Sequence, residues 1–172
     1  MKEIISRNIT EEEKSVYQVL NDLGIQYTVH YHEALFGQED ADKEGYHQPG
    51  LNLKNMLVRE KKKDEHYLVL LKDDDRLDFK KFKPMTGWSS KMTFARDEDL
   101  MKYLGVHAGS CSIFGLINDK EKHVIVVLDD YITSADLDES ISFHPNINTA
   151  TLTMKVRDLY TFLEWTGNKV VK

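Results

Sequence analysis

Cysteine and proline are scarce in this chain, which has one cysteine and three prolines among 172 residues. Because Cys111 has no second cysteine to pair with, the sequence excludes an intrachain disulfide and a zinc site built from cysteine thiolates. There is no Pro-rich linker, no internal repeat and no low-complexity segment. We therefore expect a single domain over residues 1–172, a length that can bury an ordinary hydrophobic core.

Long apolar runs are absent as well. Asp, Lys or Arg interrupts every apolar stretch before it reaches the length of a membrane span. The N-terminal segment MKEIISRNITEEEK has neither an apolar core of signal-peptide length nor a small-residue cleavage site. With 41% hydrophobic and 30% charged residues, the composition is typical of a soluble globular protein, and we expect it in the cytoplasm.

Basic residues are outnumbered, with 23 Lys and Arg against 29 Asp and Glu and a net charge of −6. A protein that coats long stretches of nucleic acid needs many Lys and Arg contacts with phosphates, so we expect no DNA partner. This balance still permits a protein that grips only the end of an RNA. The basic clusters at Lys61–Lys63 and Lys80–Lys83 are explained most simply as solvated surfaces.

Four widespread catalytic motifs are missing from the chain, namely GxxxxGK[ST], GxGxxG, HExxH and GxSxG. Nucleotide hydrolysis, dinucleotide binding, zincin chemistry and α/β-hydrolase chemistry therefore lose their usual signatures. We expect no cofactor.

Hydrophobic periodicity predicts helices and strands that do not alternate strictly. Thr10 and Glu13 form a capping box, apolar residues then recur at helical spacing, and Gly24 is a stop signal. Helices are expected over 11–23, 75–83, 97–103 (with Asp97 as its cap) and 156–166. Strands are expected over 26–31, 53–60, 66–72, 91–95, 123–130, 140–143 and 150–155.

The order of these elements favours an α/β domain of the mixed α+β type over a doubly wound one. We expect the strands 53–60 and 66–72 to form a hairpin, and the most apolar strand, 123–130, to be central. A short helix and then a loop are expected within 33–50, and the small residues of 105–116 predict a loop.

Histidine and cysteine side chains raise two questions. His30 and His32 lie two apart on one expected strand, so both can face the same side. Without a third ligand at a recognisable spacing, they are interpreted as half-exposed strand residues, and no metal site is expected. Cys111 lies between serines with no base evident beside it, which favours a small buried filler over a nucleophile.

Three further stretches offer chemistry, although each taken singly has a commoner structural explanation. LKNMLVRE places Lys54 and Asn55 at the start of an apolar strand, where an ammonium group can hold a phosphate or stabilise an oxyanion. GVHAGSCSIFGL has three glycines, which let a backbone approach a ligand and turn amide N–H groups toward it. FHPNINTAT offers His144 and Thr149 at the mouth of a strand.

In this order, the three stretches resemble the YbaK/ProX family of trans-acting aminoacyl-tRNA deacylases and the editing domain inserted in many bacterial prolyl-tRNA synthetases. The matching motifs here are KNMLVRE with HYLVLL, then GSCSIFGLIND, then FHPNINTATLTMKVRDLYTFLEWTG. The resemblance covers nearly the whole chain from the first helix onward. Family loops often carry valine and proline where this chain has Cys111 and Ile113, so Ile113 keeps a backbone N–H that proline lacks.

The resemblance implies a YbaK-like domain with a mixed, largely antiparallel sheet, and hydrolysis of the ester between a wrong amino acid and tRNA(Pro). Alanine is the first-choice amino acid and cysteine the second. A non-catalytic module that binds aminoacyl-tRNA or a synthetase, and a hydrolase of a small aminoacyl or peptidyl compound, remain open alternatives. The implied partners are the acceptor end of aminoacylated tRNA(Pro) and, as a further candidate, prolyl-tRNA synthetase, with no membrane.

The same resemblance assigns roles to residues. Backbone amides of the glycine loop, residues 105–116, would hold the ester or its oxyanion, a lysine would hold a phosphate, and a histidine would shape the pocket or orient the substrate. The implied catalytic residues are Lys54, Gly109 and His144, and the implied substrate-binding residues are Asn55, Ser110, Ser112 and, as a weaker candidate, Thr149.

Overall fold

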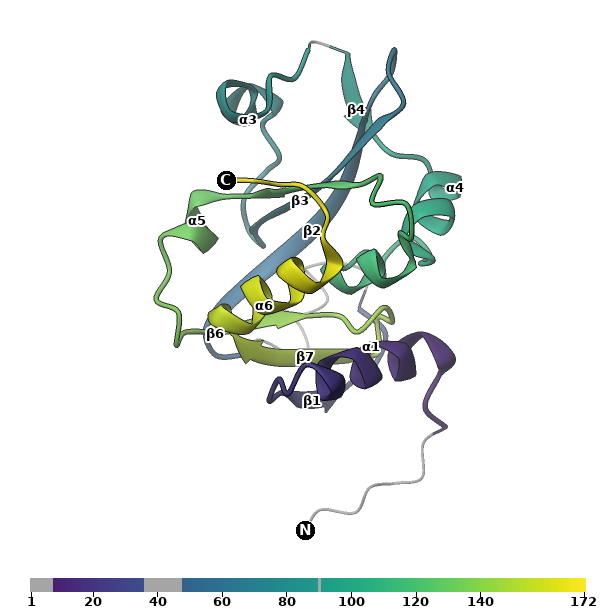
Figure 1. Cartoon of the computed structure of the whole chain (residues 1–172), viewed down its shortest axis with the longest axis vertical. Coiled ribbons are helices and arrows are strands. Elements are labelled where there is room, and N and C mark those ends of the chain that lie inside the picture. The colour runs from purple at the N-terminus through teal and green to yellow at the C-terminus, as the bar shows by residue number, and fades with distance from the viewer. Residues whose placement is uncertain (1–7, 36–47, 90) are drawn as a thin grey trace.

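The computed structural model describes residues 8–35, 48–89 and 91–172, and an eight-stranded sheet forms its centre (Figure 1). The strand order is β1-β7-β6-β2-β3-β5-β8, and β4 pairs with β2 outside this path. Neighbours are antiparallel except where β2 meets β6, β3 meets β5 and β5 meets β8. This mostly antiparallel mixed sheet with flanking helices confirms the predicted α/β class. The strands are β1 Thr28–Tyr31, β2 Leu51–Glu60, β3 Glu65–Lys72, β4 Met92–Phe94, β5 Ile125–Leu128, β6 Ser140–Phe143, β7 Ala150–Lys155 and β8 Val170–Val171.

The predicted hairpin is present as β2 and β3, and both of its faces are buried. Successive side chains of a strand point to opposite faces. Leu57 and Leu68 therefore join the main core, whereas Val58 and Val69 join a smaller cluster on the other face. Burial on both faces explains why β3 reads as a nearly continuous apolar run.

Helices cover the two faces unequally (Figure 1). Side chains from α1, α6, η1 and η2 pack into the main core, whereas α3 contributes Phe82 to the smaller cluster. No helix among the described residues is both long and apolar enough to cross a lipid bilayer. The helices are α1 Glu11–Asp22, α3 Phe79–Thr86, α4 Asp97–Asp99, the π-helical turn η1 Leu100–Leu104, the 3-10 helix η2 Ile113–Asn118, α5 Asp130–Thr133 and α6 Val156–Thr166.

The first and last predicted helices are confirmed. At the start of α1, the Glu13 N–H donates to Thr10 Oγ1 at 3.3 Å, and the Glu13 carboxylate accepts from the Thr10 N–H at 2.9 Å. Val16 and Leu20 lie one turn apart on the face that is fully buried. The helix predicted over 156–166 is α6, with the same bounds.

The prediction of 123–130 as a central strand is wrong in position and length. β5 lies between β3 and the two-residue strand β8, while β2 occupies the middle of the sheet. Aspartates shorten it at both ends: Asp119 accepts from the Val124 N–H at 2.8 Å, and Asp129 caps α5 through the Tyr131 N–H at 2.9 Å. The strand is apolar because both faces of the sheet are covered there, not because it is central.

Three helix boundaries differ from the prediction. α3 begins after Asp78, whose carboxylate accepts from the Lys80 N–H at 2.9 Å, so the helix starts later than residue 75. Asp97 is the first helical residue rather than the cap, because the Asp99 carboxylate bonds the Arg96 N–H at 3.1 Å. The loop expected over 105–116 instead enters the helix η2 at residue 113. The helix expected within 33–50 falls on residues outside the described part of the chain.

Candidate functional site

The first half of β2 has an edge that no described strand covers. β2 pairs with β6 only at Leu51 and Asn52, and with β4 only from Val58 onward. Among the described strands, residues 53–56 therefore have a neighbour on one side only, which is β3. Unpaired strand edges expose backbone donors and acceptors to a ligand. The predicted Lys54 and Asn55 lie on this open edge.

Asn55 ties this edge to the glycine loop. Its Oδ1 accepts a hydrogen bond from the Ile113 N–H at 2.9 Å, across 58 residues of sequence. The N–H that distinguishes isoleucine from proline at this position is therefore used to hold the loop. Next to it, Ser112 Oγ accepts from the Phe114 N–H at 3.2 Å and caps η2, and the Ser112 side chain is fully buried.

Some amide N–H groups of the glycine loop are hydrogen-bonded within the protein, and others are not. The Ser110 N–H donates to the His107 carbonyl at 3.1 Å and is already bonded. Gly109 has a φ of +87°, a conformation that strains any residue with a Cβ. The N–H groups of Gly109, Cys111 and Ser112 find no acceptor within the described ranges of the chain. Because Ser112 is fully buried, the loop can offer the Gly109 and Cys111 amides to a bound oxygen atom.

Lys54 lies on the opposite face of the sheet from Asn55. Lys54 is paired with Leu71 across the hairpin, and Asn55 with Leu70. Leu71 belongs to the smaller cluster under α3, whereas Leu70 belongs to the main core. Cross-strand partners share a face, so the Lys54 ammonium reaches the site from the far side of the open edge. It has no ion-pair partner in the described part of the chain.

His144 follows β6 and has one determined tautomer. Its Nδ1 lies 3.0 Å from the Ala150 carbonyl oxygen, which can only accept, so Nδ1 carries the proton and Nε2 keeps its lone pair. Burial lowers the pKa of His144 below the ordinary value, and the nearby His32 lowers this pKa further. The neutral ring can thus accept a hydrogen bond at Nε2 at neutral pH.

His32 packs beside His144, a role that the sequence analysis, which interpreted it as a half-exposed strand residue, did not predict. Its Nδ1 donates to the Glu33 carbonyl at 2.7 Å, and its Nε2 accepts from Thr151 Oγ1 at 2.9 Å. Both ring nitrogens are in use, which leaves neither for the metal site considered with His30. The His32 N–H donates to the Thr149 carbonyl at 3.0 Å, so Thr149 holds the turn by its backbone.

Aromatic contacts join the glycine loop to the turn that begins at His144, after β6. The Phe114 ring meets Phe143 edge-on at 5.7 Å and Phe162 at 5.2 Å between centroids. Phe143 precedes His144, and Phe114 lies two residues after Ser112, so this packing holds the two motifs side by side. Such contacts join segments far apart in the chain, and nothing in the local sequence predicts them.

Cys111 is unsuited to nucleophilic attack. Burial raises the pKa of its thiol to about 12, which keeps the sulfur protonated at neutral pH. The side chain is partly buried against the main core. Both observations favour the filler interpretation made from the sequence.

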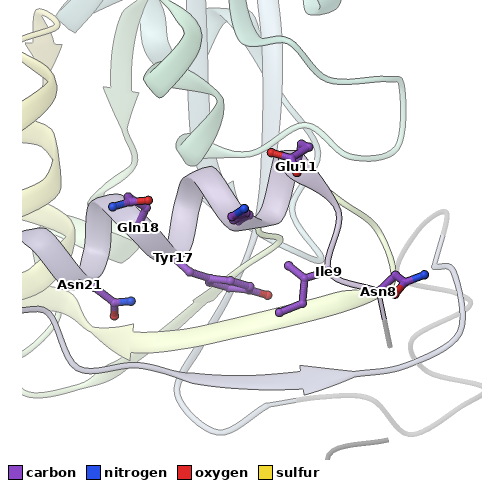
Figure 2. Close-up of a pocket in the computed structure, with 7 residues that line it drawn as sticks. Asn8, Ile9, Glu11, Tyr17, Gln18 and Asn21 are labelled. Carbon is purple, nitrogen blue, oxygen red and sulfur yellow. The ribbon is translucent and has the colours of Figure 1, made fainter. Parts of the chain in front are cut away.

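A separate hollow of about 600 Å³ runs along α1 (Figure 2). It contains none of the predicted site residues and offers no pair of groups suited to acid–base or nucleophilic chemistry. Its lining residues are Asn8, Ile9, Glu11, Lys14, Tyr17, Gln18 and Asn21.

Replacing Asn55 by leucine is expected to lower the free energy of unfolding by about 1–3 kcal/mol, because the buried Ile113 N–H loses its acceptor. Urea unfolding followed by circular dichroism measures this loss. Asn55→Asp keeps an acceptor oxygen and is the matched control. Equal losses in both variants would show that the hydrogen bond to Ile113 contributes nothing.

Acidification is expected to destabilise the fold through His144. Its folded-state pKa is lowered, so its contribution to stability is fully present above pH 6.5 and is lost as the pH falls through the folded value. Unfolding free energies at pH 7.5 and 5.5 should therefore differ more for the wild type than for His144→Gln. An unchanged difference in the variant would contradict the burial of a neutral His144.

The site is thus a strand edge, a loop with available amides and a neutral histidine, brought together on a mixed α/β fold. This combination defines a small mixed α/β domain with backbone N–H groups and a strand edge that have no partner among the described residues. The family model of the aminoacyl-tRNA editing domain matches residues 33–162. The chain belongs to this family.

Relatives support the same assignment. The chain is 31% identical over 158 residues to the prolyl-tRNA editing protein ProX of Acetoanaerobium sticklandii, with 92% of this chain and 94% of the relative covered. It is 29% identical to the prolyl-tRNA synthetase associated domain-containing protein 1 of Danio rerio, with 92% and 84% covered. A crystal structure of a protein suggested to be a trans-editing enzyme for prolyl tRNA synthetase superposes with a TM-score of 0.69 at 18% identity, over 96% of this chain and 99% of the other, and supports the fold.

Proposed function

We propose that this protein hydrolyses the ester of tRNA(Pro) mischarged with alanine, in the cytoplasm and in trans to a prolyl-tRNA synthetase. The observation that carries the proposal is the hydrogen bond that the Ile113 N–H donates to Asn55 Oδ1, which ties the glycine loop to the open edge of β2 in an editing-domain fold. The whole chain, 1–172, acts as one domain in this proposal.

The proposed task follows from a limit on recognition. A synthetase pocket made for proline cannot strongly reject a smaller apolar amino acid, since each lost methylene changes binding by only about 1–3 kcal/mol. A second site that admits alanine and excludes proline by size removes the error. The ProX relative is named for prolyl-tRNA editing, which supports this class of substrate.

The reaction needs a water, an oxyanion site and a held 3′ end. Water attacks the ester carbonyl, the C–O bond to the ribose breaks, and the ribose oxygen takes a proton as free amino acid leaves. The amides of Gly109 and Cys111 are proposed to donate to the oxyanion that forms during this attack. A neighbouring ribose hydroxyl can position the water, so the proposal assigns no side chain as general base.

Lys54 and His144 are given positioning roles. Because Lys54 approaches from the face opposite Asn55, its ammonium is better placed for a phosphate of the tRNA end than for the oxyanion. His144 Nε2, with its lone pair, is proposed to accept a hydrogen bond from the substrate's amino group. Ser112 caps a helix and Thr149 holds a turn, so each supports the site through its neighbours.

A binding module is the second candidate. The fish relative is named only as a synthetase-associated domain, which favours a role in binding. Assays of Ala-, Cys- and Pro-tRNA(Pro) deacylation by the purified protein distinguish an editing enzyme from a binding module. Rapid loss of Ala-tRNA(Pro) with Pro-tRNA(Pro) spared is expected. Selective loss of Cys-tRNA(Pro) would show that the enzyme is specific for cysteine. Binding of the charged tRNA without hydrolysis of any ester would show that the protein is a binding module.

A further inference from the structure

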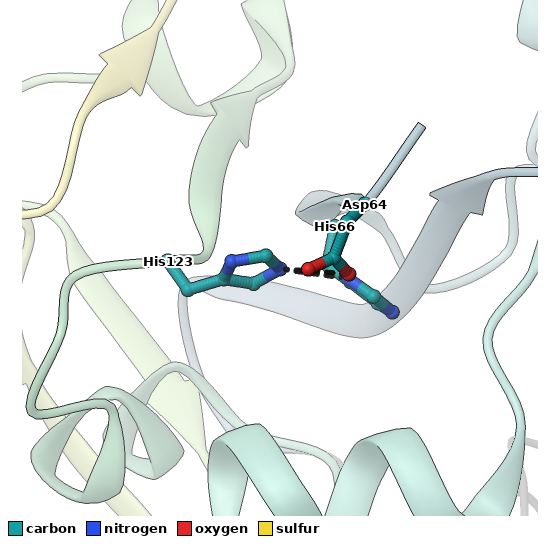
Figure 3. Close-up of side chains that lie close together, drawn as sticks. All are labelled: Asp64, His66 and His123. Carbon is teal, nitrogen blue, oxygen red and sulfur yellow. Dashed lines mark hydrogen bonds and ion pairs between the residues drawn. The ribbon is translucent and has the colours of Figure 1, made fainter. Parts of the chain in front are cut away.

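A cluster of possible metal ligands lies at the end of the hairpin away from the candidate site (Figure 3). Asp64 is in the turn between β2 and β3, His66 is on β3, and His123 precedes β5. One ligand atom from each residue lies within 4.8 Å of the other two. The open edge at Lys54 is six strand residues from the end of β2, roughly 20 Å away at about 3.3 Å per residue.

The three atoms approximate one face of a tetrahedron. His66 Nδ1 lies 2.9 Å from His123 Nε2, and Asp64 Oδ1 lies 4.0 and 3.9 Å from these two nitrogens. Zinc bound by imidazole at about 2.0–2.1 Å needs ligand atoms roughly 3.3 Å apart. Shifts of less than about 1 Å, mainly at Asp64, meet this requirement. The Asp64 side chain is 81% exposed and can make them.

The surroundings orient the histidines as a metal site requires. His66 is 5% exposed, and its second nitrogen, Nε2, is buried without a hydrogen bond, 3.7 Å from Asp99 Oδ1. Arg96 holds that carboxylate through two bonds of 3.0 and 3.1 Å. A carboxylate behind the far nitrogen of a ligating histidine is a regular feature of zinc sites. The Tyr103 ring stacks on His123 at 4.2 Å.

We propose that Asp64, His66 and His123 bind one zinc-type divalent ion, with water in the fourth position. Two imidazoles and one carboxylate suit zinc better than magnesium or calcium, which prefer oxygen ligands. Without metal, the contact of 2.9 Å between His66 Nδ1 and His123 Nε2 requires that one of these nitrogens donates its N–H to the lone pair of the other. When the metal binds, this proton leaves the ligating nitrogen for the second nitrogen of the same ring, so both imidazoles stay neutral, and the metal joins the β2–β3 turn to the segment before β5. This revises the expectation from the sequence, in which only His30 and His32 were considered.

Titration of the chelator-treated full-length protein with zinc chloride, followed calorimetrically, tests the site. One zinc per chain is expected, with no competition from excess magnesium. Asp99→Asn should weaken zinc binding by about 10- to 100-fold by removing the charge behind His66, and His123→Gln and Asp64→Asn by at least as much. Because Asp64 is exposed, its variant keeps the fold even where a histidine variant does not.

Two control variants remove the same chemical groups elsewhere. Asp75→Asn and His107→Gln replace exposed residues outside the cluster and should leave zinc affinity unchanged. Stoichiometric binding that survives both Asp64→Asn and His123→Gln would overturn the proposal, as would weak binding without stoichiometry. Deacylation is not the readout, so failure of this proposal leaves the proposed function untouched.

Discussion

Replacing Lys54 by alanine is expected to lower kcat/KM for deacylation of Ala-tRNA(Pro) by about 10- to 100-fold, because a charge-assisted bond to phosphate contributes about 1.5–3 kcal/mol. Lys54 is half-buried on β2 and has no ion-pair partner among the described residues, so its charge is available to the substrate. The effect should appear mainly in KM, since a phosphate contact is present in the ground state as well as in the transition state.

Two variants make this result specific to Lys54. Lys54→Arg keeps the charge and should recover part of the activity, while Lys91→Ala removes an exposed lysine next to β4 and should have no effect. Steady-state kinetics at low and moderate salt measure all three proteins. Equal activity of Lys54→Ala and the wild type would refute the assignment of this lysine to the substrate.

Replacing Phe114 by alanine is expected to lower the free energy of unfolding by about 3–5 kcal/mol, as for other fully buried aromatic residues. Phe114 contacts both Phe143 and Phe162, so its loss opens a cavity where the glycine loop, β6 and α6 meet. Partial collapse around this cavity would also displace the loop amides. Chemical denaturation measures the stability change.

The matched control is Phe94→Ala. Phe94 is 51% exposed and contacts one ring, Phe79, at 5.9 Å between centroids. Its removal should cost at most about 1.5 kcal/mol. Similar losses for the two variants would show that the contact between loop and turn does not carry the stability assigned to it.

The sequence predicted those helices and strands whose formation depends on residues close by in the chain. The capping box at Thr10 and the alternating pattern of 150–155 required no distant partner, and both were found where the sequence placed them. The position of 123–130 in the sheet was not predictable in the same way. An apolar strand reveals that it is covered on both faces, but not which strands lie beside it.

In the candidate site too, the sequence predicted which residues are near in the chain but not how distant segments meet. The sequence placed Lys54 and Asn55 together, yet adjacent strand residues point to opposite faces, and register alone shows which face meets the glycine loop. The tautomer of His144 depends on the Ala150 carbonyl, six residues away across a turn. The cluster at Asp64 forms only because β3 and β5 are parallel neighbours, a pairing that no local pattern encodes.

The most direct test of the account is multiple turnover of Ala-tRNA(Pro) by a trace amount of the purified protein. The account predicts that many equivalents of alanine are released per protein molecule, while Pro-tRNA(Pro) remains intact. Release of no more than one equivalent, with tight binding of the charged tRNA, would contradict an editing enzyme and leave a binding protein.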